Sequence, residues 1–344
     1  MVRHPEIVTS GGVRRRKIFV SPRLSRRQNY SENPSLDYSL ASTIITYPNA
    51  PQSDFKDTMA PHSQPFSLQV APTKAEIASA LLIPKLLDLS TNAIQQRGCF
   101  TIALSGGSLP SLLSGLKEIK EIDWSKWHVL LADERCVPLT SADSNLGALK
   151  QAFLDQVPIP ATQVYGINES LIQVSPKAVA EEYESIVQQV LRKSGNSEKE
   201  EDRLMLDVAV LGFGPDGHTC SLFPNHALLK EDTKWVAGIS DSPKAPPERI
   251  TLTYPVLNQR TRHVLVVGAG ASKQPIVGQT CLVCQTKAIK QKGYDEYACE
   301  LASPAPFPVG RVYPKESLTW MIDQEALPES ISDVATNSGT SSKY

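Results

Sequence analysis

The 344-residue sequence lacks the features that mark membrane proteins and disulfide-stabilised proteins. Proline or a charged residue interrupts every apolar run before it reaches the roughly 18 residues that a membrane helix needs. Only six cysteines occur in the chain, and no apolar signal sequence accompanies them. We therefore expect a soluble protein without a membrane partner, in a reducing intracellular compartment such as the cytoplasm.

The sequence also has almost no net charge, because 35 Lys and Arg face 36 Asp and Glu. These charges are distributed unevenly: the first 30 residues hold eight basic side chains and one acidic side chain, Glu6. The rest of the chain is consequently acidic by about eight charges, which argues against a nucleic-acid partner for a folded domain there. Hydrophobic residues make up 41% of the sequence, which is enough for a substantial core.

The composition divides the chain into three segments. Residues 1–65 are rich in Ser, Pro, Asn, Gln and Arg and show no sustained period, which predicts a disordered basic extension. The cluster Arg14–Lys17 is typical of a nuclear signal, of part of a mitochondrial presequence, or of a solvated tail. Residues 66–330 are expected to form a single ordered domain, and residues 331–344 a disordered tail. Met59 offers an alternative translation start.

Hydrophobic periodicity predicts an α/β fold for the ordered segment. Thr73 and Glu76 form a capping-box pattern, so we expect a helix that is interrupted near Pro84 and ends at Gly98. A second helix with one apolar face should follow Ser175. Four short apolar runs have the character of buried strands: Phe100–Leu104, His128–Leu131, Asp207–Leu211 and His263–Val267. Such strands, alternating with amphipathic helices, indicate a three-layer α/β/α arrangement around a mostly parallel, Rossmann-like sheet.

A polar or glycine-rich motif follows each of these four apolar runs. The motifs are SGGS (105–108), DER (133–135), GFGPDGHT (212–219) and GAGASK (268–273). Open α/β sheets bind ligands beyond the carboxyl ends of their strands. We therefore expect the four motifs to meet at one edge of the sheet and to form an active site.

The first motif is a candidate phosphate-binding loop. It runs from Ser105 through Gly106 and Gly107 to Ser108. It lies between a strand and a helix with Pro110 in its first turn, so its backbone amides would point at an anion near the positive end of the helix dipole. It lacks the GKS ending of a nucleotide-triphosphate loop. The alternative is a tight turn that needs glycine only for its geometry.

Residues 212–217 match the dinucleotide-binding pattern G-x-G-x-x-G, but two features argue against a dehydrogenase. The acid at the expected distance, Asp232, does not end a following strand, and Pro215 with Asp216 would crowd or repel a pyrophosphate. The segment fits a catalytic loop better. His218 would act as a general base and Asp216 would orient its ring, whereas the alternative is a purely structural histidine.

Four basic residues are candidates for holding an anionic substrate. Arg135 lies at a strand end, where its guanidinium would either bind a phosphate or carboxylate with two hydrogen bonds or form an ion pair with Asp133 or Glu134. The others lie in or beside loops, where they would supply positive charge to the site or remain solvated: Lys244, Arg249 and Lys273.

Signals for a covalent nucleophile or a metal are weak. The sequence has no G-x-S-x-G elbow, and Cys220 stands two residues from His218, a separation at which side chains usually point apart. Cys281 and Cys284 form a single C-x-x-C with Cys299 nearby, whereas zinc normally takes four ligands. We expect neither a metal nor another cofactor.

Five stretches resemble the 6-phosphogluconolactonase family: ALSGGSLPSLL, LADERCVPLTSADSN, DVAVLGFGPDGHTCSLFPNH, SDSPKAPPERITLTYPVLN and the GASK turn. The similarity runs from about Phe66 to Leu327. Proteins of the related glucosamine-6-phosphate deaminase group typically continue DGH as IAFNEP, whereas residues 219–224 follow the lactonase version. One stretch departs from the family pattern: QPIVGQTCLVCQTKAIKQKG, after Lys273, stands where the family usually has a plain amphipathic helix.

The resemblance implies hydrolysis of a sugar-phosphate lactone, 6-phosphogluconolactone, in the oxidative pentose phosphate pathway. It assigns the role of base to His218, substrate contact to Arg135 and the glycine loop, and phosphate contacts to the three other basic residues. In the mechanism that we expect, His218 deprotonates a water molecule and Asp216 orients His218. The alternatives are a sugar-phosphate isomerase or deaminase of the same fold and a non-catalytic sugar-phosphate sensor. We expect a monomer or a weak homo-oligomer.

Overall fold

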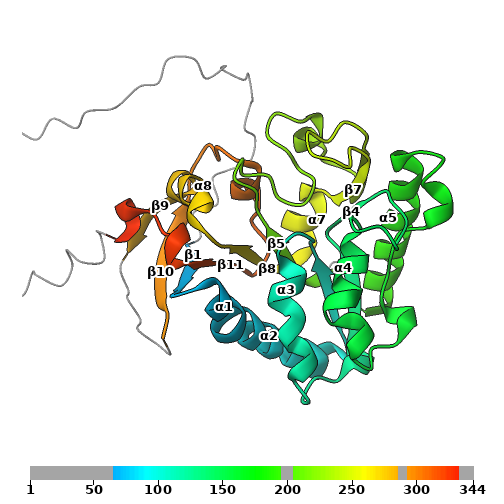
Figure 1. The fold of residues 1–344 in the computed structure, drawn as a ribbon, viewed down its shortest axis with the longest axis horizontal. Coiled ribbons are helices and arrows are strands. Elements are labelled where there is room, and N and C mark those ends of the chain that lie inside the picture. Colours follow the sequence, from blue (N-terminus) through cyan, green and yellow to red (C-terminus); the bar gives the residue numbers. More distant parts are fainter. Residues whose placement is uncertain (1–64, 195–203, 286–292, 333–344) are drawn as a thin grey trace, which may run out of the picture. The chain divides into compact units, whose positions relative to one another are not determined.

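The computed structural model describes residues 65–194, 204–285 and 293–332, without the side chains of residues 283–285. The expected extension (1–65) and tail (331–344) lie almost wholly outside these ranges. The described residues form an eight-stranded sheet in the order β3-β2-β5-β8-β11-β1-β10-β9 and a three-stranded sheet in the order β4-β7-β6. Helices flank the large sheet, with α1 and α2 on one side of it and α7 and α8 on the other (Figure 1).

The elements follow one another along the chain as alternating strands and helices. The strands are β1 (Phe66–Ala71), β2 (Phe100–Leu104), β3 (Trp127–Leu131), β4 (Asp133–Arg135), β5 (Leu206–Gly212), β6 (Val236–Ile239), β7 (Arg249–Leu252), β8 (Thr261–Gly268), β9 (Cys281–Gln285), β10 (Asp295–Leu301) and β11 (Ser317–Asp323). The α-helices are α1 (Lys74–Glu76), α2 (Ile83–Arg97), α3 (Leu109–Leu113), α4 (Asn145–Ala152), α5 (Pro176–Ser194), α7 (Tyr254–Gln259) and α8 (Gln274–Thr280). One π-helix, η1 (Ile77–Leu82), joins α1 to α2, and the 3-10 turns are η2 (Ser114–Glu118), η3 (Trp124–Lys126), η4 (Leu154–Gln156), η5 (Ala161–Gln163), η6 (Glu169–Leu171), η7 (Ala227–Lys230), η8 (Ala271–Lys273), η9 (Pro308–Arg311) and η10 (Gln324–Ala326).

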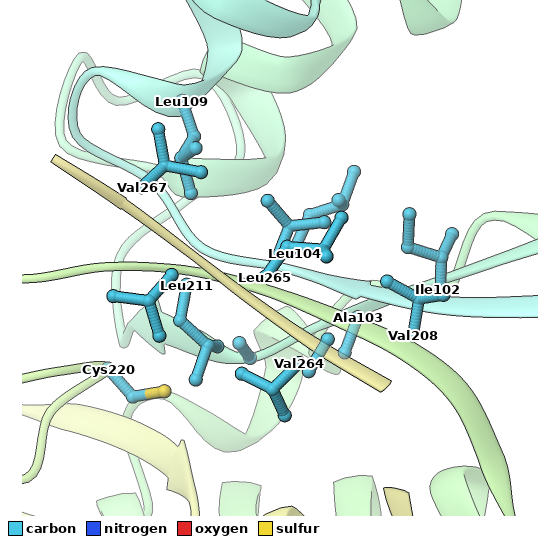
Figure 2. Packing of buried hydrophobic residues seen from close by; sticks show 14 of the residues in the cluster. Ile102, Ala103, Leu104, Leu109, Val208, Leu211, Cys220, Val264, Leu265 and Val267 are labelled. Atoms are coloured by element: carbon cyan, nitrogen blue, oxygen red, sulfur yellow. The ribbon is translucent and has the colours of Figure 1, made fainter. Parts of the chain in front are cut away.

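The four predicted strands are present as β2, β3, β5 and β8, and they are neighbours that all run parallel. In the register, Leu104 of β2 pairs with Leu131 on one side and with Val210 on the other. Apolar side chains of β2, β5 and β8 pack together with Leu109 of α3 (Figure 2). Because both faces of these strands are covered, their sequences are continuously apolar. The prediction of an α/β fold with a large, mostly parallel sheet is thus confirmed.

The first helical segment begins at the predicted capping box. The Thr73 hydroxyl donates a hydrogen bond of 2.8 Å to the Glu76 carboxylate, and the Glu76 N–H donates one of 3.4 Å to the Thr73 hydroxyl. The backbone changes from the π-helix to α2 next to Pro84, and α2 ends at Gly98, whose φ of 81° is left-handed. The predicted start and end of this segment agree with the structure, whereas the predicted interruption near Pro84 is only a change from π-helical to α-helical geometry within one continuous helix.

The continuous segment Lys74–Arg97 is the one helix of the described residues that is long and apolar enough to cross a membrane by length and composition. Its apolar side chains face the core, where Leu82 and Leu86 are fully buried. The expectation that every apolar run is too short overlooked this segment, because Pro84 and Lys85 interrupt the apolar sequence without ending the helix. Packing against the sheet accounts for its composition.

The stretch after Lys273 does not form a plain amphipathic helix. Helix α8 ends at Thr280 after seven residues, and β9 follows directly. Strand β9 pairs with β10, which pairs antiparallel with β1, so two strands extend the large sheet. Cys299 in β10 is disulfide-bonded, which the cysteine count did not predict, whereas four other thiols are free: Cys99, Cys136, Cys220 and Cys281.

Candidate active site

A pocket of about 580 Å³ lies at the carboxyl ends of the parallel strands. Its walls come from the segments that follow β2, β5 and β8 and from β4 and β7 of the small sheet. The structure brings most of the candidate residues together there: Ser105, Gly106, Gly107, Ser108, Arg135, His218, Arg249 and Lys273. Asp216 and Lys244 are not among the lining residues, but the side chains of both, which are 36% and 40% exposed, contact His218.

The glycine loop, residues 105–108, forms one wall of the pocket. The Ser105 N–H donates to the Val210 carbonyl at 3.1 Å, which ties the loop to β5. A Cβ atom at Gly106 would lie 1.8 Å from the side-chain oxygen of Asn145, so the close approach of α4 requires glycine there. The following helix, α3, has only five residues, so a helix dipole contributes less to anion binding than the sequence suggested.

The turn after β5 holds Asp216 against His218. The Gly214 N–H donates to the His218 carbonyl at 2.9 Å, and the Gly217 N–H donates to the Gly214 carbonyl at 3.0 Å. Within this turn, Asp216 Oδ1 lies 2.5 Å from His218 Nδ1. A Cβ atom at Gly214 would lie 2.1 Å from the imidazole ring, so glycine at this position leaves room for the ring.

The hydrogen bond between these side chains fixes the tautomer of His218. Because an ionised carboxylate only accepts hydrogen bonds, Nδ1 carries the proton and Nε2 keeps its lone pair. Burial lowers the pKa of His218, while the neighbouring Asp216 raises it. Burial opposes ionisation of Asp216, but hydrogen bonds from His218 and Lys244 lower the pKa of this carboxyl to about 2. At neutral pH the pair is therefore a neutral imidazole beside a carboxylate, as a general base requires.

Lys244 lies beside the base rather than in the pocket wall. Its Nζ is 3.2 Å from Asp216 Oδ1 and 3.1 Å from His218 Nδ1. A positive charge at this distance stabilises the Asp216 carboxylate and disfavours protonation of His218, and it lowers the pKa of both groups. The structure thus places Lys244 where its charge acts on the candidate base, and the phosphate contact that the sequence suggested stays a prediction.

Phe223 lies between His218 and Arg249 and contacts both side chains. Its ring stacks on the imidazole of His218 with centroids 4.9 Å apart and an angle of 29° between the planes. The guanidinium carbon of Arg249 lies 5.6 Å from the centroid of the same ring. Phe223 is buried, so its ring restricts the plane of the imidazole. Nothing in the local sequence singled out this residue, although it stands in the stretch that carries the family resemblance.

Arg135 in β4 and Arg249 in β7 are direct cross-strand partners. The buried guanidinium of Arg249 donates to the carbonyls of Lys244 and Pro246, each at 2.8 Å. Arg135 Nη1 donates to the Asp143 carbonyl at 2.6 Å, and the buried Nε of Arg135 has no hydrogen-bond partner among the described residues. Burial lowers the pKa of Arg249, and the charge of Arg135 lowers it further. Two like charges directly opposite each other repel, so a bound anion would stabilise this pair.

Lys273 supplies positive charge from the segment after β8. Its Nζ donates to the Phe213 carbonyl at 2.5 Å and lies 5.2 Å from the centroid of the Phe213 ring. Burial lowers the pKa of Lys273, and the charge of Lys244 lowers it further. The pocket thus combines four Lys and Arg residues, of which Lys74 is the one that the sequence did not suggest, with a glycine loop, an arrangement suited to a phosphorylated ligand.

Three buried polar residues lie at the site: Asp133 and Glu134, which belong to the predicted DER motif, and Asn145, which escaped the sequence analysis. The Asp133 carboxylate accepts a hydrogen bond of 3.0 Å from Ser221, and the Asn145 side chain donates one of 2.8 Å to the Asp133 carbonyl. Glu134 accepts hydrogen bonds from backbone groups at the start of α4, in place of the ion pair with Arg135 that was an alternative. Two acids directly after a buried strand were the available signal, since buried carboxylates need specific partners.

Cys220 lines the pocket, but its environment does not favour a nucleophile. Burial holds the pKa of its thiol well above the ordinary value, so the reactive thiolate is scarce. Among residues 65–194, 204–285 and 293–332, no group of three or more metal-ligating side chains is present. His218 remains the candidate base of the pocket.

Comparison with known proteins places this geometry among sugar-phosphate enzymes. The sequence model of a family described as "Glucosamine-6-phosphate isomerases/6-phosphogluconolactonase" matches residues 72–315. A "Probable 6-phosphogluconolactonase 3, chloroplastic" of Oryza sativa subsp. indica is 40% identical over 244 residues, which cover 70% of this chain and 68% of the relative. A "Probable 6-phosphogluconolactonase" of Schizosaccharomyces pombe is 42% identical over 193 residues, which cover 55% and 73%. The solved 6-phosphogluconolactonase from Trypanosoma cruzi has a TM-score of 0.60 at 24% identity, over 75% of this chain and 94% of that chain, and supports the fold.

Proposed function

Since the chain belongs to the family of glucosamine-6-phosphate isomerases and 6-phosphogluconolactonases, we propose that it hydrolyses 6-phospho-D-glucono-1,5-lactone to 6-phospho-D-gluconate in the oxidative pentose phosphate pathway. The names of the rice and fission yeast relatives support the lactonase activity rather than the isomerase activity. The observation that carries the proposal is the 2.5 Å contact of Asp216 with the pocket-lining His218. This pair supplies the general base that lactone hydrolysis needs.

In the proposed mechanism, Nε2 of His218 takes a proton from a water molecule as that water attacks the lactone carbonyl carbon. Asp216, which accepts the Nδ1–H, stabilises the imidazolium that forms. The tetrahedral intermediate then breaks the bond to the ring oxygen, and the imidazolium returns its proton to that leaving oxygen. The products are the open acid and the regenerated neutral histidine, so no covalent enzyme intermediate is required.

We propose that the substrate phosphate binds to the glycine loop and to the pocket-lining Arg135, Arg249 and Lys273. The repulsion between the two paired arginines supports this placement, because a dianion would relieve it. A remote anchor of this kind orients the reacting carbonyl and thereby contributes to the rate as well as to affinity.

The test of the proposed function is a direct hydrolysis assay on freshly prepared 6-phosphogluconolactone, corrected for spontaneous opening. We expect turnover that saturates with substrate. Hydrolysis no faster than the spontaneous rate would refute the lactonase proposal. The same protein is then assayed with glucosamine 6-phosphate, where release of ammonia would favour the deaminase alternative. Binding of 6-phosphogluconate without turnover of either compound would favour a sensor.

We propose in addition that residues 1–58 carry a targeting signal. These residues lie outside the described part of the chain, but their first 30 positions are basic, poor in acids and include serine, as is typical of organelle presequences. The name of the rice relative contains the word chloroplastic. A fluorescent fusion of residues 1–58 tests this proposal. Signal in plastids, mitochondria or the nucleus would support it, and a diffuse cytosolic signal would favour a cytoplasmic enzyme.

A further inference from the structure

We propose that Glu134 is a positioning residue whose buried carboxylate holds Arg135 and Asn145 in the anion-binding wall of the pocket. Both of these neighbours line the pocket, whereas Glu134 does not. Its effect on an anionic ligand is therefore exerted through them. The inference rests on the proposed function only for the identity of the substrate.

Glu134 is 2% exposed, and its carboxylate accepts four hydrogen bonds. Oε1 accepts the backbone N–H groups of Arg135 and Asn145, each at 2.7 Å. Oε2 accepts the Leu146 N–H at 2.8 Å and the Ser144 hydroxyl at 3.1 Å. A single side chain thus joins the end of β4 to the start of α4, across a loop of nine residues.

These four donors are all neutral, and the three backbone N–H groups among them require a group that accepts hydrogen bonds. Burial raises the pKa of Glu134, while the backbone hydrogen bonds lower it. A glutamine of the same size would turn an NH₂ group toward two of the donors. Glu134→Gln therefore breaks the Leu146 bond if the NH₂ group takes the place of Oε2, or the Arg135 and Asn145 bonds if it takes the place of Oε1, without opening a cavity.

The two residues held by Glu134 are connected to the rest of the anion-binding wall. Arg135 Nη1 donates to the Asp143 carbonyl at 2.6 Å, so its guanidinium is tied to the loop that Glu134 closes. Asn145 is buried, and its side-chain oxygen fills the space beside Gly106 of the glycine loop. Loosening Glu134 would therefore displace the arginine and the glycine loop together.

The first experiment compares Glu134→Gln with a matched variant, Glu184→Gln. The Glu184 carboxylate on α5 likewise accepts two backbone N–H groups, those of Trp235 and Val236, at 2.8 and 2.9 Å, but Glu184 does not line or adjoin the pocket wall. For both variants we would measure Tm, kcat and KM for the lactone, and the inhibition constant of inorganic phosphate. Should Glu134→Gln not fold, Glu134→Asp, which keeps the charge on a shorter chain, takes its place.

We expect both substitutions to lower Tm, because each breaks backbone hydrogen bonds. Only the change at Glu134 should raise KM and the phosphate inhibition constant, by about tenfold, with a smaller effect on kcat. Equal KM and equal phosphate inhibition in the two variants would overturn the proposal and leave Glu134 as a structural cap.

The second experiment uses the wild-type protein and does not depend on turnover. Inorganic phosphate should slow hydrogen exchange at the amides of Asn145 and Leu146 more than at the control amides of Trp235 and Val236. An equal response at all four amides would overturn the proposal. Phosphate-dependent protection in a protein that fails to hydrolyse the lactone would refute the proposed function and still support the role of Glu134.

Discussion

At the level of single residues, His218 lines the pocket with an unprotonated Nε2 because Asp216 engages its Nδ1 at 2.5 Å. We predict that His218→Ala lowers kcat by about 10²- to 10⁴-fold, the usual contribution of a general base. Binding of 6-phosphogluconate should change little, because the basic side chains of the pocket remain. Steady-state kinetics with product inhibition measure both quantities. Near wild-type turnover by folded His218→Ala would remove His218 from the mechanism.

Lys244 makes the pH dependence of the enzyme testable. Its charge lowers the pKa of His218, so Lys244→Met should raise that pKa. A base acts only when it is unprotonated, and hence the acidic limb of the kcat/KM profile should move to higher pH in the variant. The comparison is Lys177→Met, which removes an exposed lysine paired with Glu181 at 3.7 Å. An acidic limb that stays in place in Lys244→Met, as in the control, would contradict this role.

The sequence predicted part of this site because some of its chemistry is local. Asp216 and His218 stand two residues apart on one glycine-rich turn, so their spacing alone indicates an orienting acid and a base. Lys244 stands 26 residues after His218 in the sequence, shortly before β7, and its Nζ lies 3.1 Å from His218 Nδ1. Such a contact is set by the packing of the small sheet, which local spacing does not reveal. For the same reason the roles of Phe223 and Glu134 emerged only from the structure.

At the level of elements, the turn after β5 depends on a glycine next to the imidazole. We predict that Gly214→Ala lowers kcat by at least tenfold, because its Cβ atom would lie 2.1 Å from the ring of His218 and displace it. Gly278→Ala in α8 is the control, since its Cβ atom would meet Pro328 at 3.3 Å, away from the pocket. Kinetics and Tm of both variants are the measurements. Unchanged turnover in Gly214→Ala would show that the turn tolerates a side chain.

The glycine loop and the basic wall predict that the phosphate of the substrate matters for the rate. We expect gluconolactone without phosphate to have a kcat/KM at least a hundredfold lower than that of the phosphorylated lactone, since the remote anchor orients the carbonyl. Both lactones are assayed at the same pH and salt, with spontaneous opening subtracted. Comparable kcat/KM values would contradict the phosphate-binding role of the loop at residues 105–108.

Some strands could be predicted from the sequence, and others could not. Strands β2, β3, β5 and β8 were predicted because central parallel strands are apolar along their whole length. Strand β1 was missed although its alternating burial is typical of a strand, and the strands of the small sheet were missed because three or four residues are too few to establish a period. Strand β9 lies in the stretch after Lys273 that departs from the helix usual in the family, since the segment after Thr280 is rich in residues that favour strands.

For the whole molecule, topology explains why the site lies where it does. The neighbouring strands β2, β5 and β8 run parallel, so the segments that follow them meet at one edge of the sheet. Arg135 and Arg249 come from the small sheet. They stand opposite each other on the antiparallel strands β4 and β7, and both line the pocket. The strands of both sheets thus bring His218, the glycine loop and the two arginines to one pocket, where the proposed base and the proposed phosphate contacts would act together.

The described fold also predicts how much of the chain the activity needs. Every candidate site residue lies beyond Met59, and the first strand of the large sheet begins at Phe66. A shortened protein that starts at Met59 should therefore fold and keep its lactonase activity, with kcat/KM within about twofold and Tm within a few degrees of the full chain. Residues 1–58 are poor in the apolar side chains that would offset the entropy of ordering them, so their removal should cost little stability.

Thermal melting and hydrolysis rates of the full and shortened proteins, measured side by side, test this prediction. Shortening the chain further, to begin at Thr73, is the matched control, because it deletes β1 and with it the pairing to both β10 and β11. That deletion removes the fully buried Leu68 from the core and should abolish folding. A large loss of Tm or activity already in the protein starting at Met59 would mean that the preceding residues pack on the domain, and the domain boundary near residue 65 would be wrong.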